Sequence, residues 1–593
     1  MRKTLKYFLI AAILIFSLAI RLYKIDTNLP HLYWHDENNS VETALRFSAG
    51  NLRPQTFQHG MLLSLTLAGE YAAYYGIRFF TGIYHSPTDL LKEYLMNPTN
   101  FYLISRITTS LFGIASILLI YSICLKLYNN RTALLASLFF SLSFLPFVMS
   151  KWTKEDPLSV FFLLSALLMC AHLLRRCDDG KDPKIRFYNL AGLFVGLASA
   201  AKYYSFFGIV FIFLTHLYIY RAGIQRGKRM NFLLYCFDIK LIMSGLFFII
   251  GFAAGNIYAV IDPRFFYTDV TTMSGQLFYP EAASWTRYFT DHLKDAMGSG
   301  LLEILALISS IFFIMKRSKK EMLLLSYPEV MYLFYMKYTG FAHYMIPVVP
   351  FMCIITAAFF NVILTKTPRR GMRYFAAGII IIALVPSLLN ILRYNALTSR
   401  PDTRTIASAW IEKNVPENAT ILSEGHISTA PVHVPQLRGN MDTLKRDLSL
   451  VLSSGGGGTL IREEMNLAQT DRRQKRYDIY RMTTLDAVQI GTVNADYVIL
   501  TGFHDMDVAQ MEYHKGRDFY SKRKAACDKL EEEYILIKEF VPFPRLSFFF
   551  PIFLIGDLKK MESIDPFKSQ EQLLQGPDIK IYFRKNLIKQ ENV

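Results

Sequence analysis

The sequence predicts an all-α polytopic membrane protein with about eleven transmembrane helices, followed by a soluble C-terminal α/β domain. Of the 593 residues, 52% are hydrophobic and only 19% are charged, which is too little charge for the surface of a water-soluble globule of this size. The apolar residues form long blocks up to about residue 395 and become sparse afterwards. We therefore expect a membrane domain over 1–395 and a soluble domain over 400–593.

The membrane half contains enough apolar segments for eleven crossings, since a helix needs about 20 apolar residues to span the bilayer core. The long candidates are 5–22, 101–124, 132–150, 157–174, 241–260, 341–363 and 373–393, and the shorter or broken ones are 188–200, 203–220, 301–315 and 322–337. No small-residue cleavage site follows the first run, so we read an uncleaved helix with a cytoplasmic N-terminus. An odd number of crossings then places the C-terminal domain outside the cell membrane.

The charges in the loops agree with this count. The expected inner loops are short and mostly rich in lysine and arginine, as the positive-inside rule requires; they are 125–131, 175–187, 221–240, 316–321 and 364–372. Lysine and arginine outnumber aspartate and glutamate by 65 to 48, a net charge of +17. Because much of this excess lies in the loops, it indicates topology and gives no reason to expect a nucleic-acid partner.

Segment 60–80 is apolar, yet it carries Glu70 and Arg78. Counting it as a crossing would invert every later loop and spoil the charge pattern. We therefore expect an interfacial helix near 60–80, lying on the membrane surface within a long outer loop over 23–100.

The tail reads as an α/β domain. A helix is predicted over DTRTIASAWIEKN with Asp402 as its N-cap. Four β-branched, apolar runs predict strands; they are NATILSEG, ADYVILTG, YILIKEFV and IKIYFRK. The glycine run at 453–458 lacks the lysine of a P-loop and predicts a flexible loop, and the charged segment 465–482 is expected to be solvated.

Two acidic groups are candidates for chemistry. His35-Asp36-Glu37 follows the first helix, and a carboxylate there can act as the general base that deprotonates an acceptor hydroxyl. Glu155-Asp156 precedes Pro157 at the start of a later helix. Both groups have a structural alternative, because Asp36 and Asp156 each suit the N-cap of the helix that follows. The two groups are predicted on the same side of the membrane, so they can face one cavity.

Cationic and aromatic residues form a second set of candidates. Lys202 lies at the apex between two half-length apolar runs, where an ammonium suits a phosphate; the alternative is snorkelling to the lipid headgroups. His343, next to Tyr344 at a predicted outer helix start, could hold a phosphate oxygen or a sugar hydroxyl, although a lone histidine at an interface is usually structural. Arg264, at another outer helix end, is a further phosphate candidate. His35, Asp36 and His59 lack metal-ligand spacing, so no metal site is predicted.

These groups, in this order, resemble the GT-C glycosyltransferases, above all the protein O-mannosyltransferases (glycosyltransferase family 39) and the lipid A aminoarabinose transferases. The two acidic motifs match His35-Asp36-Glu37 and Lys154-Glu155-Asp156-Pro157, the arginine that opens the second helix matches Arg106, and the GLA-x-x-x-K pattern ends at Lys202. Two motifs are altered. The His/Lys-Pro-Pro-Leu segment reads His59-Gly60-Met61-Leu62, and the Arg-Tyr motif reads His343-Tyr344.

The resemblance implies a polyprenyl-phosphate monosaccharide donor and an inverting transfer to a lipid, glycan or protein acceptor on the outer face of the membrane. By the same resemblance Asp36 is the base, and Glu37 and Asp156 shape the acceptor and sugar site. Lys202, Arg264, His343 and Tyr344 would hold the departing phosphate, with His35, His59, Arg106 and Glu155 lining the cavity. Whether a divalent metal assists is left open. The resemblance covers about 1–395, and the tail is similar to the soluble domains of bacterial members.

Two other classes of function remain open from the sequence. A transporter or flippase for lipid-linked glycans would share the many helices and the intramembrane charges. A non-catalytic scaffold would use the membrane half only to present the tail. For the transferase we expect Lys202 to line one cavity with Asp36 and Asp156, and Lys202→Met to weaken donor use far more than stability.

Overall fold

The computed structural model describes residues 3–33, 35–226, 235–277, 288–317, 319–335, 342–366, 370–424, 434–453, 458–470, 474–482, 487–501, 517–542 and 574–588. The chain forms two compact units. The first comprises Met1–Ile25, Asn39–Ala72 and Leu103–Leu392, and the second comprises Asp26–Asn38, Ala73–Tyr102 and Arg393–Val593. The segment between the first two predicted spans is therefore divided between the units, and three of its helices, α2 (His35–Ser48), α3 (Leu62–Phe80) and α5 (Thr99–Leu127), contain residues of both.

The first unit is built from helices. In chain order they are α1 (Lys3–Leu22), α6 (Asn130–Ser141), α7 (Phe144–Lys151), α8 (Asp156–Asp178), α9 (Ile185–Ala201), η1 (Tyr203–Gly208), α10 (Ile209–Gln225), α12 (Ile239–Gly255), α13 (Ile257–Ile261), α14 (Pro263–Leu277), η3 (Tyr288–Leu293), α15 (Lys294–Met297), α16 (Gly300–Met315), α17 (Lys319–Tyr335), η4 (Ala342–Met345), α18 (Val349–Lys366) and α19 (Arg370–Thr398).

Five helices in the described part of the chain are long and apolar enough to cross a membrane, or seven if each of two bent helix pairs forms one span. Three shorter apolar helices add to these, at Ile185–Ala201, Ile239–Gly255 and Val349–Thr365. Each segment predicted to cross contains at least one helix, although residues 336, 337 and 341 lie outside the described residues. Segment 341–363 begins with the 3-10 helix η4 and a turn, so its α-helix, α18, starts only at Val349. The chain is thus a membrane protein, and the count of eleven crossings stays a prediction.

Two predicted helices are broken where the sequence places a residue that does not suit a helix. Segment 132–150 divides into α6 and α7, which meet at 60°. The break lies at Leu142 and Ser143, and Pro146 accounts for it, because a proline ring clashes with the carbonyl group four residues earlier. Segment 241–260 likewise ends as α12 at Gly255, and Asn256 separates it from α13.

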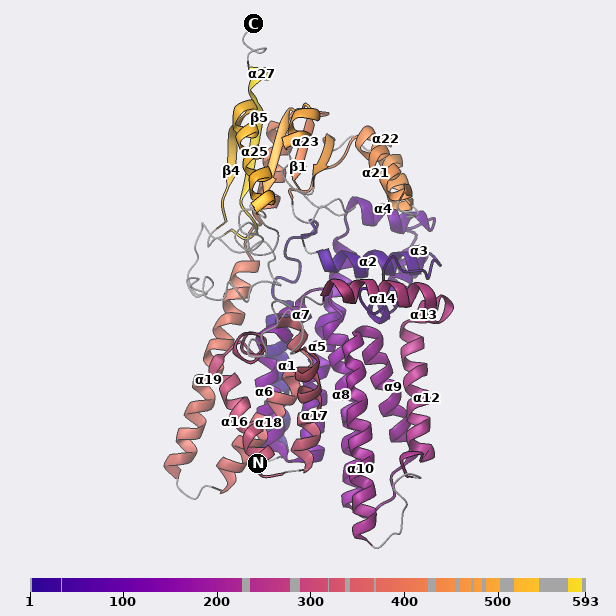
Figure 1. The fold of residues 1–593 in the computed structure, drawn as a ribbon, viewed down its shortest axis with the longest axis vertical. Coiled ribbons are helices and arrows are strands. Elements are labelled where there is room, and N and C mark those ends of the chain that lie inside the picture. Colours follow the sequence, from indigo (N-terminus) through magenta and orange to yellow (C-terminus); the bar gives the residue numbers. More distant parts are fainter. Residues whose placement is uncertain are drawn as a thin grey trace. The chain divides into compact units, whose positions relative to one another are not determined.

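Helices α9 and α12 pack backbone against backbone. Each carries two glycines four residues apart, Gly192 and Gly196 on α9 and Gly251 and Gly255 on α12. A methyl group at Gly251 would overlap the carbonyl oxygen of Leu193, and one at Gly196 would overlap that of Phe248. Small residues in this spacing allow such close approach in membrane helices. Figure 1 shows α12 running beside α9, with α14 turning sharply across the helix axes after α13.

The second unit contains a five-stranded mixed sheet. Its strands are β1 (Thr420–Glu424), β2 (Asp478–Met482), β3 (Tyr497–Thr501), β4 (Tyr534–Phe540) and β5 (Ile579–Arg584), in the order β2-β1-β3-β5-β4. The β1–β2 and β1–β3 pairs are parallel, whereas β5 is antiparallel to β3 and β4. The unit's remaining helices are α4 (Thr88–Met96), α20 (Thr403–Asn414), α21 (Met441–Ser453), α22 (Thr459–Thr470), α23 (Ala487–Thr492), α25 (Arg517–Glu533) and α27 (Lys585–Ile588).

Side chains from successive strand residues bury opposite faces of the sheet. One hydrophobic cluster joins Ile421 and Ile499 to Ala407 and Ile411 of α20. The other joins Leu422 and Val498 to residues of α23 and α25, among them Ile490 and Leu530. Helix α20 starts as predicted, because the Asp402 side chain accepts a hydrogen bond from the backbone N–H of Arg404 at 2.9 Å.

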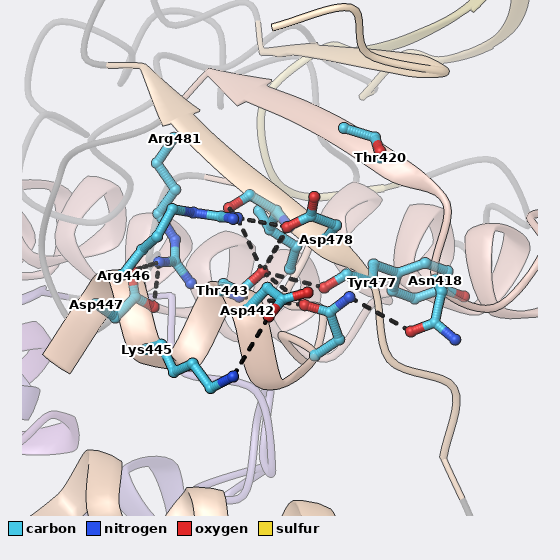
Figure 2. Close-up of polar contacts among 12 residues, drawn as sticks. Asn418, Thr420, Asp442, Thr443, Lys445, Arg446, Asp447, Tyr477, Asp478 and Arg481 are labelled. Atoms are coloured by element: carbon cyan, nitrogen blue, oxygen red, sulfur yellow. Dashed lines mark hydrogen bonds and ion pairs between the residues drawn. The ribbon is translucent and has the colours of Figure 1, made fainter.

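The prediction that 465–482 is solvated is wrong for its last residues, whereas residues 465–470 of α22 are exposed or half-buried. The last residues of the segment form the edge strand β2, in which Ile479 and Met482 are buried. The charges that suggested solvation are paired with helix α21: Asp478 with Arg446 at 2.5 Å, and Arg481 with Asp447 at 2.6 Å. Figure 2 shows both pairs near Thr443, whose hydroxyl accepts from the Ile479 N–H at 2.7 Å. The glycine run at 453–458 lies mostly outside the described residues.

Candidate functional site

A buried cluster of charges lies where three helix ends of the first unit meet. Lys202 caps the C-terminus of α9 in an extended conformation, as its position between two half-length runs suggested. Its Nζ lies 3.3 Å from Glu155 Oε2, 3.8 Å from Asp156 Oδ2 and 3.4 Å from His59 Nδ1. The side chains of Lys202, Glu155 and Asp156 are 7%, 1% and 0% exposed, so the ammonium and both carboxylates are withdrawn from solvent.

The two carboxylates are held by separate hydroxyl groups. Ser40 donates to Glu155 Oε1 at 2.7 Å, and Tyr204 donates to Asp156 Oδ1 at 2.9 Å. Helix α8 starts at Asp156, so the predicted N-cap role of Asp156 is wrong by one position, and Glu155 takes that position without a side-chain capping bond. Asp156 Oδ2 accepts no hydrogen bond from any described residue, although it is buried. Glu155 Oε2 is buried in the same way, and both oxygens face the Lys202 ammonium, Asp156 Oδ2 at the longer distance of 3.8 Å. A hydroxyl group of a ligand can therefore hydrogen-bond to Asp156 Oδ2 with less competition from the ammonium.

The electrostatics of the cluster favour the ionised form of Glu155. Burial alone would raise the pKa of this carboxyl, but the positive charges of Lys202, His59 and Lys154 outweigh it and bring the pKa from 4.5 to about 2. Ser40 contributes in the same direction through its hydrogen bond. Glu155 is thus a fixed negative charge at neutral pH.

An aromatic group adjoins the acidic one. Besides donating to Asp156, Tyr204 contacts the rings of Tyr335 and Tyr344 edge-on, with centroids 6.3 and 6.1 Å away. Tyr335 and Tyr344 are stacked 5.3 Å apart, and His343 packs against Tyr344 at 4.5 Å. Predicted residues Tyr344 and His343 are therefore connected to Asp156 through Tyr204. Neither Tyr204 nor Tyr335 was predicted; Tyr204 had a signal in the sequence, because it follows Lys202 by two positions.

The loop that carries His59 is fixed against the end of α9. Tyr203 donates to the carbonyl oxygen of Phe57 at 2.9 Å, and the N–H of Met61 donates to Asn256 Oδ1 at 2.9 Å. Gly60 fits only because it lacks a side chain, since a methyl group there would overlap the Ala200 carbonyl. This close approach explains why a glycine follows His59 and how His59 comes to lie beside Lys202.

Arg106 stabilises the other side of the acidic turn. It is 1% exposed, its guanidinium donates to the Ile25 carbonyl oxygen at 2.8 Å, and it lies 4.5 Å from the centre of the Trp152 ring. The neighbouring Ser105 and Thr153 hydroxyls share a hydrogen bond of 2.5 Å. Arg106 thus stabilises the turn between α7 and α8 through its contact with Trp152.

The remaining predicted residues belong to helices α2 and α14. Asp36 and Glu37 occupy the first turn of α2 within the second unit, with Asp36 half-buried and Glu37 2% exposed. Because α2 begins at His35, Asp36 lies inside the helix and not at its N-cap; the His35 side chain lies outside the described residues. Arg264 is exposed in the first turn of α14, and no described residue of the Lys202 cluster hydrogen-bonds to it. That Asp36 and Lys202 share one cavity stays a prediction.

No group of three or more His, Cys, Asp or Glu side chains that would suit a metal ion occurs within the part of the chain that the structure describes. The cluster contains the carboxylates of Glu155 and Asp156, the imidazole of His59 and the ammonium of Lys202. The ammonium lies within 3.8 Å of both carboxylates. The carboxylates can accept hydrogen bonds from hydroxyl groups of a ligand, and the Lys202 ammonium can donate to its anionic oxygens.

Comparison with known proteins gives the geometry a context. Residues 102–252, which contain Arg106, Glu155, Asp156 and Lys202, match the family model of dolichyl-phosphate-mannose-protein mannosyltransferases. The oligosaccharyltransferase of Archaeoglobus fulgidus in its apo form superposes with a TM-score of 0.50 at 12% identity, over 98% of this chain and 89% of that one. The chain has the fold of the GT-C glycosyltransferases.

Other GT-C structures are similar to smaller degrees. ArnT from Cupriavidus metallidurans bound to undecaprenyl phosphate matches at 12% identity with a TM-score of 0.45, covering 86% of this chain and 95% of that one. The Pmt1-Pmt2 complex of S. cerevisiae bound to the sugar donor matches at 18% identity with a TM-score of 0.32, over 47% of this chain and 36% of that one. No curated protein sequence matches the chain. The superposition on the Archaeoglobus fulgidus oligosaccharyltransferase, together with the family-model match, confirms the GT-C resemblance for the fold.

Proposed function

We propose that this GT-C protein transfers a monosaccharide from a polyprenyl-phosphate carrier to an acceptor on the outer face of the cell membrane. The observation that carries the proposal is the buried cluster of Lys202, Glu155 and Asp156, inside the segment that matches the mannosyltransferase model. A membrane protein rarely buries three charges among its helices without using them. The family description, which names a lipid-phosphate sugar, supports the donor class.

In the proposed reaction, Asp36 accepts the proton of an acceptor hydroxyl. The hydroxyl oxygen attacks the anomeric carbon, a new C–O bond forms with inversion, and the bond to the phosphate oxygen breaks. The electron pair leaves with the polyprenyl phosphate. Since this leaving group is already an anion of low basicity, positioning and cationic stabilisation supply most of the catalysis.

The cluster supports distinct roles for its members. Asp156 has a carboxylate oxygen available to sugar hydroxyls, while Glu155 fixes the Lys202 ammonium at the shorter distance. A phosphate entering the site would compete with Asp156, the more distant carboxylate, for that ammonium. His343 and Tyr344 would contact the same phosphate from the aromatic side, and Arg264 would join from α14.

The order of the acidic motifs supports a shared role for Asp36 and this cluster. His35-Asp36-Glu37 and Lys154-Glu155-Asp156-Pro157 occur in the order that the GT-C resemblance implies. The base and the cluster are therefore proposed to act on one substrate pair.

The test compares membrane lipids of a deletion strain with those of strains expressing variants. The proposal expects a polyprenyl-phosphate monosaccharide to accumulate on deletion and to be cleared by the wild-type protein. Asp36→Asn should slow clearance by about 10²–10⁴-fold, the usual effect of losing a general base. Asp26→Asn is the matched control, because Asp26 is an exposed carboxylate of the same loop. Normal clearance by Asp36→Asn would reject the base, and accumulation of a complete glycan facing the cytoplasm would instead indicate a flippase.

A further inference from the structure

The second unit contains a polar hollow of about 440 Å³ at the amino-terminal ends of strands β1 and β2. Its polar lining comes from three segments: Glu417 and Asn418 before β1, Asn440 and Asp442 at the start of α21, and Gln474 and Arg476 before β2. Figure 2 shows Asn418 and Asp442 near the first residues of β2. The volume falls in the range of about 300–1,000 Å³ that is typical of small-molecule sites.

Hydrogen bonds connect the three segments to one another around the hollow. Asn418 is left-handed, with φ of 64°, and its backbone N–H donates to the Arg476 carbonyl oxygen at 2.7 Å. The Asn440 amide donates to Asn418 Oδ1 at 3.3 Å, and Arg476 donates to the Gly439 carbonyl oxygen at 2.9 Å. A lining held in this way needs little reorganisation when a ligand binds.

The chemistry of the lining favours a neutral ligand with many hydroxyl groups. The lining contains three amides, which both donate and accept, two carboxylates, which accept, and one guanidinium, which donates, so it offers both donors and acceptors. Vicinal hydroxyl groups of a sugar ring need this mixture. Met441 and Ala468 add an apolar patch against which the C–H face of a ring can pack.

Charge argues against the other small ligands. Arg476 is the one cation among the lining residues, and it already donates to the Gly439 carbonyl oxygen and lies 4.0 Å from Glu464 Oε1. A phosphate or a carboxylate would have to compete with these partners. A divalent cation needs more ligands of its own kind, and no three-residue group of metal-binding side chains occurs among the described residues.

We propose that this hollow is a saccharide-binding site, which takes one neutral pyranose unit of a glycan. It lies wholly within the second unit and differs from the donor site proposed around Lys202. Saccharide binding at this hollow requires no transfer reaction and no lipid carrier. An experiment can therefore detect or exclude such binding whether or not the proposed transferase activity is correct.

The test measures saturation-transfer NMR on the full chain in lipid nanodiscs, without a lipid donor. The probes are methyl α-pyranosides of mannose, glucose and galactose. We expect at least one to show saturation transfer, and Asn418→Gly to weaken its affinity by about two- to tenfold, because glycine keeps the left-handed backbone and deletes only the amide. Ala468→Trp should fill the hollow and abolish the signal. Gln469→Trp is its control, since Gln469 is the exposed next residue of α22 and does not line the hollow.

Several results would overturn the saccharide site. No transfer to any of the three pyranosides, or a signal that survives both Asn418→Gly and Ala468→Trp, would overturn the site. Asp442→Asn separates the ligand classes: a neutral saccharide should lose less than about tenfold in affinity, because the amide still hydrogen-bonds. Binding of calcium or inorganic phosphate in place of the pyranosides, measured by calorimetry on the same nanodiscs, would also contradict the proposal.

Discussion

Lys202 lies between two buried carboxylates, and this changes what a substitution there is expected to do. From the sequence, Lys202→Met should spare stability, because methionine keeps the apolar stem. In the structure the substitution would leave Glu155 and Asp156 buried without their cation. Breaking a buried pair by removing one partner typically costs about 3–5 kcal/mol.

We therefore expect Lys202→Met to lower the free energy of unfolding by several kcal/mol and to lower the thermal midpoint of the detergent-solubilised protein. Glu155→Gln in the same chain should recover part of the loss, because a neutral amide needs no counter-charge. A thermal-shift series on the two single variants and the double variant measures the coupling. Strictly additive effects would show that Lys202 and Glu155 do not interact.

Glu155 also predicts how stability depends on pH. Its pKa falls from 4.5 to about 2 on folding, because the nearby cations outweigh the effect of burial. A carboxyl with a depressed folded-state pKa stabilises the protein fully above its unfolded pKa, and that contribution is lost as pH falls through the folded pKa. The stability difference between wild type and Glu155→Gln should thus be constant above about pH 5 and shrink between pH 4.5 and 2. Equilibrium melting at a series of pH values checks it, and a difference that grows on acidification would contradict it.

At this scale the sequence predicted the charged residues better than their partners. Lys202, Glu155 and Asp156 were found because charges in apolar surroundings stand out, and their motif order was informative. Tyr204, Ser40 and Tyr335 were not found, because hydroxyl and aromatic side chains are common in membrane helices and acquire a role only when folding places them beside a charge.

Among the elements, the α9–α12 pair shows how strictly a helix contact can limit side-chain size. Gly251 lies against the Leu193 backbone, whereas at Gly245 on the same helix no heavy atom lies within 4 Å of the place that a methyl group would take. We expect Gly251→Ala to lower the free energy of unfolding by about 1–3 kcal/mol through overpacking. Gly245→Ala should be neutral or stabilise by up to about 1 kcal/mol, because alanine suits a helix better. Thermal unfolding of the two variants in one detergent makes the comparison, and equal effects would rule out the close contact.

Element boundaries were predicted less well than element types. The helices at 132–150 and 241–260 were expected to be continuous, because their apolar runs are continuous, yet Pro146 and Asn256 interrupt them. Strand β2 was missed for the opposite reason: its charges suggested solvent, and only the fold supplies the α21 side chains that neutralise them. Four of the five strands were recognised from their β-branched, apolar composition.

For the whole molecule, the positive-inside pattern predicts where each loop lies. Reporter fusions at residues 130, 180, 320 and 368 should report the cytoplasm, and one at 590 the outside. Residue 180 is the most informative position, because it lies in the short turn between α8 and α9. An outside signal there would contradict the topology and require α3 to cross the membrane.

The fold class of the whole molecule followed from composition and motif order, but the division into units did not. Composition changes near residue 395, whereas the second unit also includes Asp26–Asn38 and Ala73–Tyr102. Within that unit, Leu32 exchanges two hydrogen bonds with the Gln436 side chain, and Arg404 lies 4.0 Å from the Tyr33 ring. Such pairings between residues hundreds of positions apart leave no signal in one sequence.

The strand order has a consequence for biosynthesis. Strand β5 lies between β3 and β4 and supplies the ladder partner of β4, yet it follows both in the chain. While the polypeptide is being synthesised, β4 must wait for residues 579–584 before it can join the sheet. Until then β3 also has one uncovered edge, open to mispairing with other chains. If synthesis stops after β4, the sheet therefore lacks β5 and the edge of β3 stays uncovered. A quality-control protease could recognise this incomplete domain even after the membrane helices have inserted.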